Sequence, residues 1–348
     1  MMWPPKGRKR RILAIHTHKT RLHMFRMRQS VHTLPASNIK QATEKMWNNP
    51  KPFSLFLIVS FLIASMCSCN ADDTGGKHVT QPDTANVVST AKTVLIYMAA
   101  QNSLGARRNQ QADSLEIMQA YKDIPGDSRI LLFIDNKYAP RIYRIDKTTP
   151  RPVMVKRWQN DEDSASPAFF GELLSFIKRF YPSDEYGMVL WSHATGWVPP
   201  SLALTRNAKQ RHAKPLSFGI DDGEDFGSDN GSEMEIRDMA VVMKKADFHA
   251  RYIFFDACLM QNIEVVYELR HAADYIVGAP ISTPGAGTNY TNQIRKGLFD
   301  DDVRNIASTY LSDVCDPSQA EDYSDFGLVI SVVKTSELDK LVALLRDR

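Results

Sequence analysis

The sequence predicts an α/β protein with a mostly parallel central sheet that is flanked by helices on both faces. From residue 93 onward, short uninterrupted apolar runs alternate with stretches of helical period, which is the order of elements in this class. Uninterrupted apolar runs fit strands that are buried on both sides, as the strands of parallel sheets are. Residues 93–348, about 255 in number, suffice for one domain with a large core.

The individual elements follow from these runs. Strands are expected at residues 94–99, 130–134, 186–191, 252–255, 275–278 and 327–333. Helices are expected at residues 110–121, 168–181, 236–246, 260–272 and 303–314, with a further helical pattern at 336–348. Residues 141–145 and 153–158 predict a small hairpin insertion. Because the last helical pattern stops without a cap, we expect the domain to be truncated at its C-terminus.

The strand expected at residues 252–255 is followed by a carboxylate and a thiol. Asp256 and Cys258 come directly after the run Y-I-F-F, ahead of the next expected helix. Catalytic and ligand-binding groups of open α/β sheets gather at the carboxyl ends of strands, so Cys258 occupies a position where chemistry is usually done. The alternative is a buried structural cysteine, because free cysteine is among the most buried residue types.

A histidine follows another expected strand in the same way. The run Y-G-M-V-L-W at residues 186–191 leads directly into S-H-A-T-G-W, which places His193 at a strand end. Neighbouring strands lie about 4.8 Å apart, so side chains from adjacent strand ends can reach one substrate. Alone, His193 would be read as a hydrogen-bonded structural histidine. Together, His193 and Cys258 predict a thiol nucleophile with a histidine partner.

The two motifs resemble those of a known family. The sequences W-S-H-A-T-G-W and F-F-D-A-C-L-M-Q-N-I-E-V-V-Y-E-L resemble the His and Cys blocks of the clostripain-like cysteine peptidases, relatives of the caspases and gingipains. The resemblance covers about residues 93–335, includes the opening V-L-I-Y-M-A-A with Asn102 after it, and implies a caspase-like fold. Family members usually have glycine after the histidine, whereas this chain has Ala194, which leaves the local backbone geometry open.

The resemblance implies peptide-bond hydrolysis through a thioester. Cys258, as the thiolate, attacks the scissile carbonyl, His193 gives a proton to the departing amine, and water releases the acyl group. The backbone amides of Cys258 and of a residue near Ala194 are expected to bind the oxyanion, and such donors are worth ~2.7 to 4 kcal/mol each. No third orienting residue is evident in the sequence, and the chemistry requires no cofactor.

Asp256 is the candidate for substrate selection. In clostripain-like enzymes the acid of the Cys block helps to line an S1 pocket for Arg or Lys, which implies the same role for Asp256. The alternative is that Asp256 caps a helix beginning near Leu259, a contribution of ~1 kcal/mol. The family pattern Gly-x-Asp-Tyr often supplies a second acid, and this chain has P-G-A-G-T-N-Y, with Asn289 at that place. We therefore expect Asn289 in the substrate pocket and a weakened basic specificity.

An acidic segment lies between the His and Cys motifs. Residues 221–235 carry seven acids and three glycines. They do not fit an EF-hand loop, yet clustered carboxylates on a Gly-rich loop suit Ca²⁺, and some clostripain-like enzymes are calcium-dependent. The alternative is a solvated acidic turn. The candidate calcium ligands are Asp221, Asp222, Asp225 and Asp229.

A basic segment, residues 205–215, precedes the acidic one. It lacks apolar anchors, so it is either a solvated surface loop or a segment that can unfold locally and enter an active site. Clostripain-like precursors can cut themselves after a basic residue between the two motifs. The resemblance therefore implies self-cleavage after Arg206, Lys209 or Arg211.

The chain before residue 93 indicates export. Residues 1–45 hold 11 Lys or Arg against one acid and are expected to be disordered or a mis-called extension. An uncharged apolar run at 53–66 is shorter than the ~20 residues of a membrane-spanning helix and is typical of a secretory signal. We expect residues 46–69 to be a lipoprotein-type signal that ends in a lipid-modified Cys69, with a simple cleaved signal as the alternative. Residues 70–92 then form a polar tether.

Charge and cysteine content narrow the function further. The first 45 residues contribute +10 to a net charge of +3, so the mature domain is acidic and nothing in it calls for nucleic acid. With Cys67 and Cys69 assigned to the signal, only Cys258 and Cys315 remain, which suggests no disulfide framework.

Three functions remain from the sequence. The first is an exported or lipid-anchored cysteine endopeptidase acting on proteins or peptides. The alternatives are a catalytically silent surface lipoprotein that keeps the fold for binding, and a thiol hydrolase that is not a peptidase. A binding protein would have no reason to retain both His193 and Cys258, which favours the peptidase.

Overall fold

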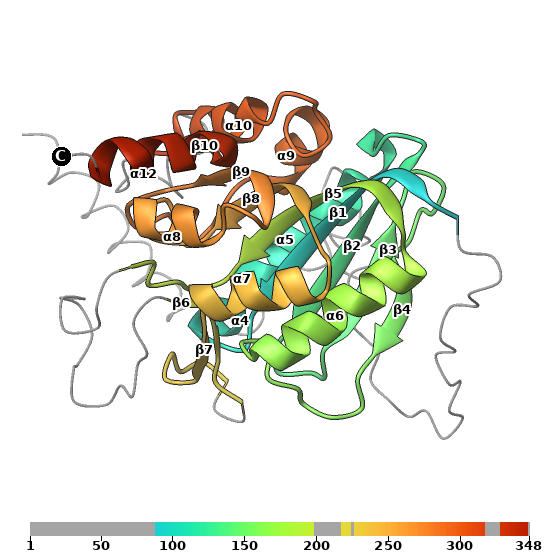
Figure 1. Ribbon diagram of the computed structural model, residues 1–348. Helices are drawn as coiled ribbons and strands as arrows, with labels where there is room; N and C mark the ends of the chain where they lie inside the picture. The colour runs from blue at the N-terminus through green and yellow to red at the C-terminus, as the bar shows by residue number, and fades with distance from the viewer. Residues whose placement is uncertain (1–87, 198–216, 224–225, 317–327, 347–348) are drawn as a thin grey trace, which may run out of the picture. The chain divides into compact units, whose positions relative to one another are not determined.

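The centre of the fold is an eight-stranded sheet (Figure 1). The computed structural model describes residues 88–197, 217–223, 226–316 and 328–346, all within one unit, His78–Arg348. In spatial order the strands are β10 (Ser331–Lys334), β9 (Ala273–Gly278), β8 (Ala250–Asp256), β5 (Ser183–Trp191), β1 (Thr90–Ala99), β2 (Ser128–Asp135), β3 (Arg141–Ile145) and β4 (Val153–Arg157).

The predicted mostly parallel sheet is confirmed. Strands β9, β8, β5, β1 and β2 run parallel to one another, and antiparallel strands form both edges. The predicted hairpin is present as β3 and β4, but it is not a separate insertion, because β3 pairs with β2 and extends the main sheet. The last expected strand is β10, which pairs antiparallel with β9.

Helices cover both faces of the sheet, also as predicted. On one face lie α6 (Pro167–Phe180), α7 (Ile236–Lys245) and α8 (Ile263–Glu268), and on the other lie α5 (Asn109–Gln119), α9 (Tyr290–Lys296) and α10 (Arg304–Val314). Successive side chains of β1 alternate between the two cores: Leu95 and Tyr97 enter the first, whereas Val94 and Ile96 enter the second. A strand buried on both faces must be apolar throughout, which explains the uninterrupted runs of the sequence.

The helix expected at residues 260–272 is shorter than predicted. Asn262 caps α8 by accepting a hydrogen bond from the amide of Val265, so the helix begins only at Ile263. Before it, the amides of Leu259 and Gln261 donate to the carbonyls of Ile281 and Ala279. These contacts hold residues 259–261 alongside the segment after β9. Asp256 therefore caps no helix near Leu259, and that alternative is wrong.

The remaining elements are short. They are α4 (Ser103–Ala106), the 3-10 helices η2 (Tyr121–Asp123) and η4 (Thr335–Glu337), a separate two-stranded sheet of β6 (Ser217–Asp221) and β7 (Ser232–Glu235), and α12 (Leu338–Arg346). Within the described ranges, no helix has the length and apolar character needed to cross a membrane. The β6–β7 pair and α4 were not predicted, and both contribute to the site described below.

Candidate active site

The sheet register brings the two predicted catalytic residues to the same edge. Strands β5 and β8 are parallel neighbours, and their register pairs Trp191 with Asp256. His193 and Cys258 each lie two residues beyond that pair. The carboxyl ends of parallel strands meet at one edge of a sheet, so both residues follow adjacent strands at that edge.

The loops that carry these residues are in direct backbone contact. Gly196 has φ +55°, and a Cβ at this position would lie 1.9 Å from the carbonyl oxygen of Leu259. The side-chain amide of Asn262 donates to that same oxygen at 2.9 Å. Leu259 itself has φ +65°, a rare conformation for a residue with a branched side chain. The glycine of the His motif thus allows the His loop to pack against the Cys loop.

Cys258 is a half-buried free thiol. The backbone amide of Thr283 donates to its sulfur at 3.3 Å, and the hydroxyl of Thr283 lies 3.6 Å from the sulfur. None of the hydrogen bonds of Cys258 within the described ranges reaches His193, a separation that is common before substrate binds. Cys315 is also free, so no disulfide consumes the thiol of Cys258.

His193 contacts two groups that the sequence did not indicate as its partners. Its Nε2 lies 2.9 Å from the hydroxyl of Ser103 and 3.2 Å from Oδ1 of Asp229. The amide and hydroxyl of Ser103 both donate to Asp229, each at 3.0 Å. Burial would raise the pKa of Asp229, but the hydrogen bonds and charge of His193 and the hydrogen bonds from Ser103 outweigh it and hold that pKa well below its usual range.

Asn102 connects the ends of three strands around this site. Its side-chain amide donates to the carbonyls of Ala99 and Ile220, each at 2.9 Å, and to the hydroxyl of Ser192 at 3.3 Å. Its side-chain oxygen accepts from the amide of Leu104. This bond caps the N-terminus of α4, whose first residue is Ser103. Asn102 is fully buried, so these bonds are shielded from water.

Ala194 does not disturb the backbone after the histidine. Non-glycine residues with positive φ in the described ranges are Arg108, Asp247 and Leu259, so Ala194 does not need the backbone freedom of glycine. Ala194 and Phe218 form an isolated antiparallel β-bridge. Its two hydrogen bonds run from the amide of Thr195 to the carbonyl of Ser217 and from the amide of Gly219 to the carbonyl of His193. The amide of Ala194 is not one of the donors in this bridge.

Buried carboxylates lie behind the Cys loop. Asp256 is 5% exposed, and its Oδ2 accepts from the amide of Thr288 at 3.2 Å and the hydroxyl of Tyr290 at 3.1 Å. Burial raises the pKa of Asp256 to about 6, although those hydrogen bonds lower it in part. Burial, with the charges of Asp256 and Glu116, raises the pKa of Asp113 to about 9.

Asn289 and Glu116 sit together next to these carboxylates. Asn289 caps α9 by accepting from the amide of Asn292, and its own amide group donates to Glu116 at 3.3 Å. Glu116, on α5, also accepts from the amide of Tyr290 at 2.7 Å. Burial raises the pKa of Glu116 as well. The sequence placed Asn289 near Asp256 but gave no sign that a glutamate from a distant helix would join them.

The predicted calcium ligands do not converge. Asp229 is engaged with His193 and Ser103, and Asp221 accepts from the amide and hydroxyl of Ser164 at 2.6 and 3.0 Å. Asp222 accepts from the amide of Asn230 at 3.4 Å. Asp225 lies outside the described residues, as do Cys69 and the basic segment with Arg206, Lys209 and Arg211. Among the described residues, no cluster of three or more His, Cys, Asp or Glu could hold a metal ion.

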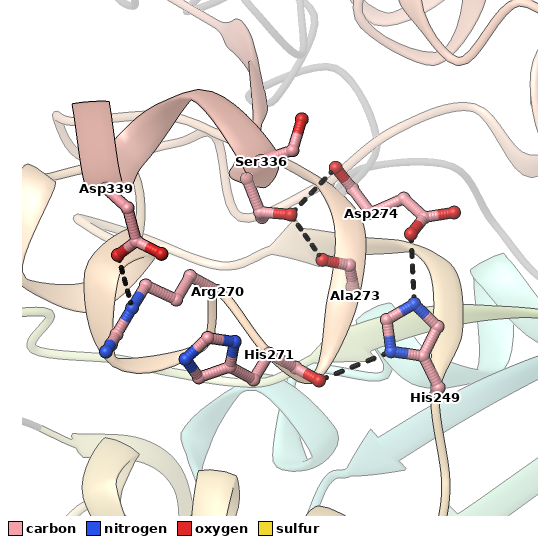
Figure 2. Close-up of a pocket in the computed structure, with 8 residues that line it drawn as sticks. His249, Arg270, His271, Ala273, Asp274, Ser336 and Asp339 are labelled. Carbon is pink, nitrogen blue, oxygen red and sulfur yellow. Dashed lines mark hydrogen bonds and ion pairs between the residues drawn. The ribbon is translucent and has the colours of Figure 1, made fainter. Parts of the chain in front are cut away.

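A separate pocket, shown in Figure 2, lies at the opposite edge of the sheet. It has a volume of about 280 Å³ and is lined by residues at the amino ends of β8 and β9 and the start of α12. Its side chains pair among themselves: His249 contacts Asp274 at 3.0 Å and Arg270 contacts Asp339 at 3.3 Å. Neither Cys258 nor His193 lines it, so it is not the candidate active site.

A cysteine and a histidine at adjacent strand ends of an α/β sheet are the side chains that a thiol hydrolase requires. Residues 96–347 match the model of the clostripain family, the C11 peptidases. The chain therefore belongs to the clostripain family and is a cysteine peptidase, a hydrolase of peptide bonds. The resemblance stated from the two motifs is confirmed.

Solved structures agree with this assignment. The chain is similar to a secreted C11 cysteine protease from Bacteroides thetaiotaomicron in complex with an irreversible peptide inhibitor, with 30% identity and a TM-score of 0.62 over 74% of this chain and 70% of that one. It is also similar to an inactive zymogen C11 protease from Parabacteroides distasonis, with 28% identity and a TM-score of 0.58 over 75% and 67%. A structure of a secreted C11 cysteine protease from Bacteroides thetaiotaomicron, "iotapain", shares the fold at 23% identity and a TM-score of 0.61 over 75% of this chain and 70% of that one. No curated protein sequence matches the chain.

Proposed function

We propose that the chain is an exported cysteine endopeptidase that cleaves after Arg or Lys, with Cys258 as nucleophile and His193 as general acid and base. The observation that carries the proposal is the register of β5 and β8, which places both residues two positions beyond the pair of Trp191 and Asp256. A nucleophile and its proton carrier must flank one substrate carbonyl, and adjacent strand ends provide that spacing.

The chemistry follows in two steps. Cys258 gives its proton to His193, its sulfur bonds to the scissile carbonyl carbon, and the C–N bond breaks as His193 protonates the departing amine. Water then gives a proton to His193 and its oxygen bonds to the thioester carbon; the C–S bond breaks, the carboxylic acid leaves, and His193 returns the proton to the sulfur of Cys258. The amides of Cys258 and Ala194 are the proposed oxyanion donors; that the bridge to Phe218 leaves the amide of Ala194 unused supports this.

The proposed preference for Arg or Lys rests on the carboxylates behind the Cys loop. Burial raises the pKa of Asp256 and Glu116, so a cation at this site would stabilise the ionised carboxylates that the protein interior disfavours. Asp256 lies behind Thr288 and Tyr290. It would therefore act on the substrate through its charge and through the segment that it holds, which includes Asn289.

Self-cleavage after Arg206, Lys209 or Arg211 is part of the proposal. The described residues on either side of that segment pair with each other, since the amide of Thr195 donates to the carbonyl of Ser217 at 3.1 Å and the amide of Gly219 to the carbonyl of His193 at 2.9 Å. Two fragments would stay joined through this ladder after a cut. One similar protein is described as an inactive zymogen, which fits a precursor that requires activation.

Export with a lipid on Cys69 is proposed from the signal-like sequence, and a similar protein is described as secreted, which supports export. Mass spectrometry of the native protein tests the lipid. A mature chain that begins at an acylated Cys69 is the expected result, and an unmodified start beyond residue 70 would contradict it.

The central experiment is a panel of fluorogenic peptides that differ only at P1, assayed with wild-type protein, Cys258→Ala and His193→Ala. We expect hydrolysis of the Arg and Lys peptides, none by Cys258→Ala, and a loss of orders of magnitude in His193→Ala. Near-normal turnover by Cys258→Ala would overturn the assignment of the nucleophile. Equal turnover of Arg, Leu and Asp peptides would overturn only the specificity.

A further inference from the structure

We infer that Asp229 is a positioning residue for His193 and that, together with Ser103, it fixes which nitrogen of the imidazole carries the reacting proton. The inference rests on the proposed Cys258–His193 mechanism and adds a third side chain to it. The observation behind it is the three-way contact among Nε2 of His193, the hydroxyl of Ser103 and the carboxylate of Asp229.

The direction of each hydrogen bond follows from what the groups can donate. An ionised carboxylate only accepts, so the hydroxyl proton of Ser103 goes to Oδ2 of Asp229, which lies 3.0 Å away. The Ser103 oxygen is then left as an acceptor toward Nε2 of His193. Oδ1 of Asp229 faces the same nitrogen as a second acceptor. Two acceptors at one nitrogen require that Nε2 carries a hydrogen.

That requirement settles the roles of the two ring nitrogens. With the Nε2 hydrogen held by Ser103 and Asp229, Nδ1 is the nitrogen that gains and loses the proton during the reaction. The same carboxylate stabilises the positive charge that His193 acquires when it takes the proton of the Cys258 thiol. Asp229 does this without touching the reacting atoms.

The structure also explains how Asp229 is held. The amide of Ser103 donates to its Oδ1 at 3.0 Å, in addition to the hydroxyl bond to Oδ2. The segment before Asp229 packs on α4, since a Cβ added at Gly105 would lie 3.2 Å from the ring of Phe226 and a Cβ added at Gly227 would lie 3.4 Å from Ala106. Asp229 and His193 are each only 18% exposed by side chain, so bulk water screens their interaction weakly.

The test compares Asp229→Asn with Asp222→Asn in the intact protein. Asp222→Asn removes the same charge from the same acidic segment, and the carboxylate of Asp222 contacts the amide of Asn230. We expect Asp229→Asn to lower kcat about 10- to 100-fold with a change in KM of less than about three-fold, because Asp229 helps the proton carrier and does not bind substrate. Asp222→Asn should stay within about two-fold of wild type.

Two further readouts separate positioning from a structural role. Asp229, from the segment before β7, is the carboxylate that contacts Nε2 of His193, and Cys258, Asp256 and Asp135 also lie at the carboxyl ends of the parallel strands. Because the Asp229 carboxylate contacts the imidazole that carries the proton, Asp229→Asn should change the pH–rate profile of kcat, whereas Asp222→Asn should leave it as in wild type. Ser103→Ala should lower kcat as well, and Ser103→Thr, which keeps the hydroxyl, should restore it. Alkylation of Cys258 by uncharged iodoacetamide should slow in Asp229→Asn at neutral pH.

The outcomes distinguish this inference from the proposed function. If His193→Ala keeps its activity, the dyad itself is wrong. If His193→Ala is inactive while Asp229→Asn matches Asp222→Asn in kcat and pH profile, only the role of Asp229 is overturned. Should Asp229→Asn fail to fold, Ser103→Ala and Ser103→Thr decide, since both keep the carboxylate; equal kcat for these two and wild type would overturn the inference.

Discussion

Replacement of Gly196 by alanine should separate the two catalytic loops. Gly196 has φ +55°, and its added Cβ would lie 1.9 Å from the carbonyl oxygen of Leu259, next to Cys258. Ordinary contact begins at 3.4 Å, so the loops must move apart by roughly 1.5 Å. A misplacement of about 1 Å can cost 10²-fold in rate, and kcat/KM is therefore expected to fall by about 10²-fold or more.

The matched control is Gly223→Ala. Gly223 has φ +60° and nothing within 4 Å of its added Cβ, so alanine there meets the same unfavourable backbone conformation without a clash. That backbone cost is about 1–2 kcal/mol in both variants, and Gly196→Ala should lose more stability because of the contact with Leu259.

The assay is kcat/KM on an Arg or Lys peptide, with the apparent Tm measured for both variants. Gly223→Ala should retain activity within about three-fold of wild type at a slightly lowered Tm. If Gly196→Ala and Gly223→Ala had equal activity, the packing of the His loop on the Cys loop would not matter for catalysis, and the reasoning would fail.

Three other predictions follow from buried polar groups and the second cysteine. Asp113 has a folded pKa of about 9 against an ordinary 3.8, so between about pH 4 and 9 the folded state holds a proton on this side chain that the unfolded state has lost. The unfolding free energy therefore falls as pH rises through that range. Asp113→Asn keeps an acceptor for the bond from Trp191 and cannot ionise. Urea denaturation should show an unfolding free energy higher by about one to a few kcal/mol at pH 8, with a smaller gain near pH 5. Equal gains at both pH values would contradict the raised pKa of Asp113. Asn102→Ala should destabilise by about 2 kcal/mol or more, seen as a lower Tm, because it removes a helix cap and the side-chain donor to the buried carbonyl of Ile220. Cys315→Ser should leave activity and Tm unchanged, because Cys315 is exposed and free, and a loss of activity would show an unrecognised role.

The fold was predictable because its strands are buried on both faces. Runs such as the one within β1 are apolar throughout, and the helices between them carry one apolar face each. The helix expected at 260–272 is shorter than predicted for a local reason. Met260 fits the helical spacing of the core, but the amides of Leu259 and Gln261 bond to the segment after β9. A long-range backbone contact of that kind leaves no periodic signal in the sequence.

The candidate site was predictable only where a residue follows a strand directly. His193 and Cys258 are visible in the sequence because His193 comes two residues, and Cys258 three residues, after an apolar run. Asp229 is 36 positions after His193, in a segment whose many acids suggested calcium. Its contact with His193 depends on the packing of that segment on α4, which no local pattern reveals. A paired serine and carboxylate at a distance in sequence can be recognised only from the folded chain.

The same contacts bear on how a cut between the motifs would leave the site. Ser103 and His193 precede residues 205–215, whereas Asp229 and Cys258 follow them. A cut in that segment would divide the groups that meet at Nε2 of His193 between two fragments. Backbone bonds from Thr195 to Ser217 and from Gly219 to His193 would join the two fragments beside the histidine. The two bonds from Ser103 to Asp229 would join them at its Nε2. Peptide-bond cleavage breaks none of these bonds, so His193 would keep its partner carboxylate although the two residues then belong to different chains.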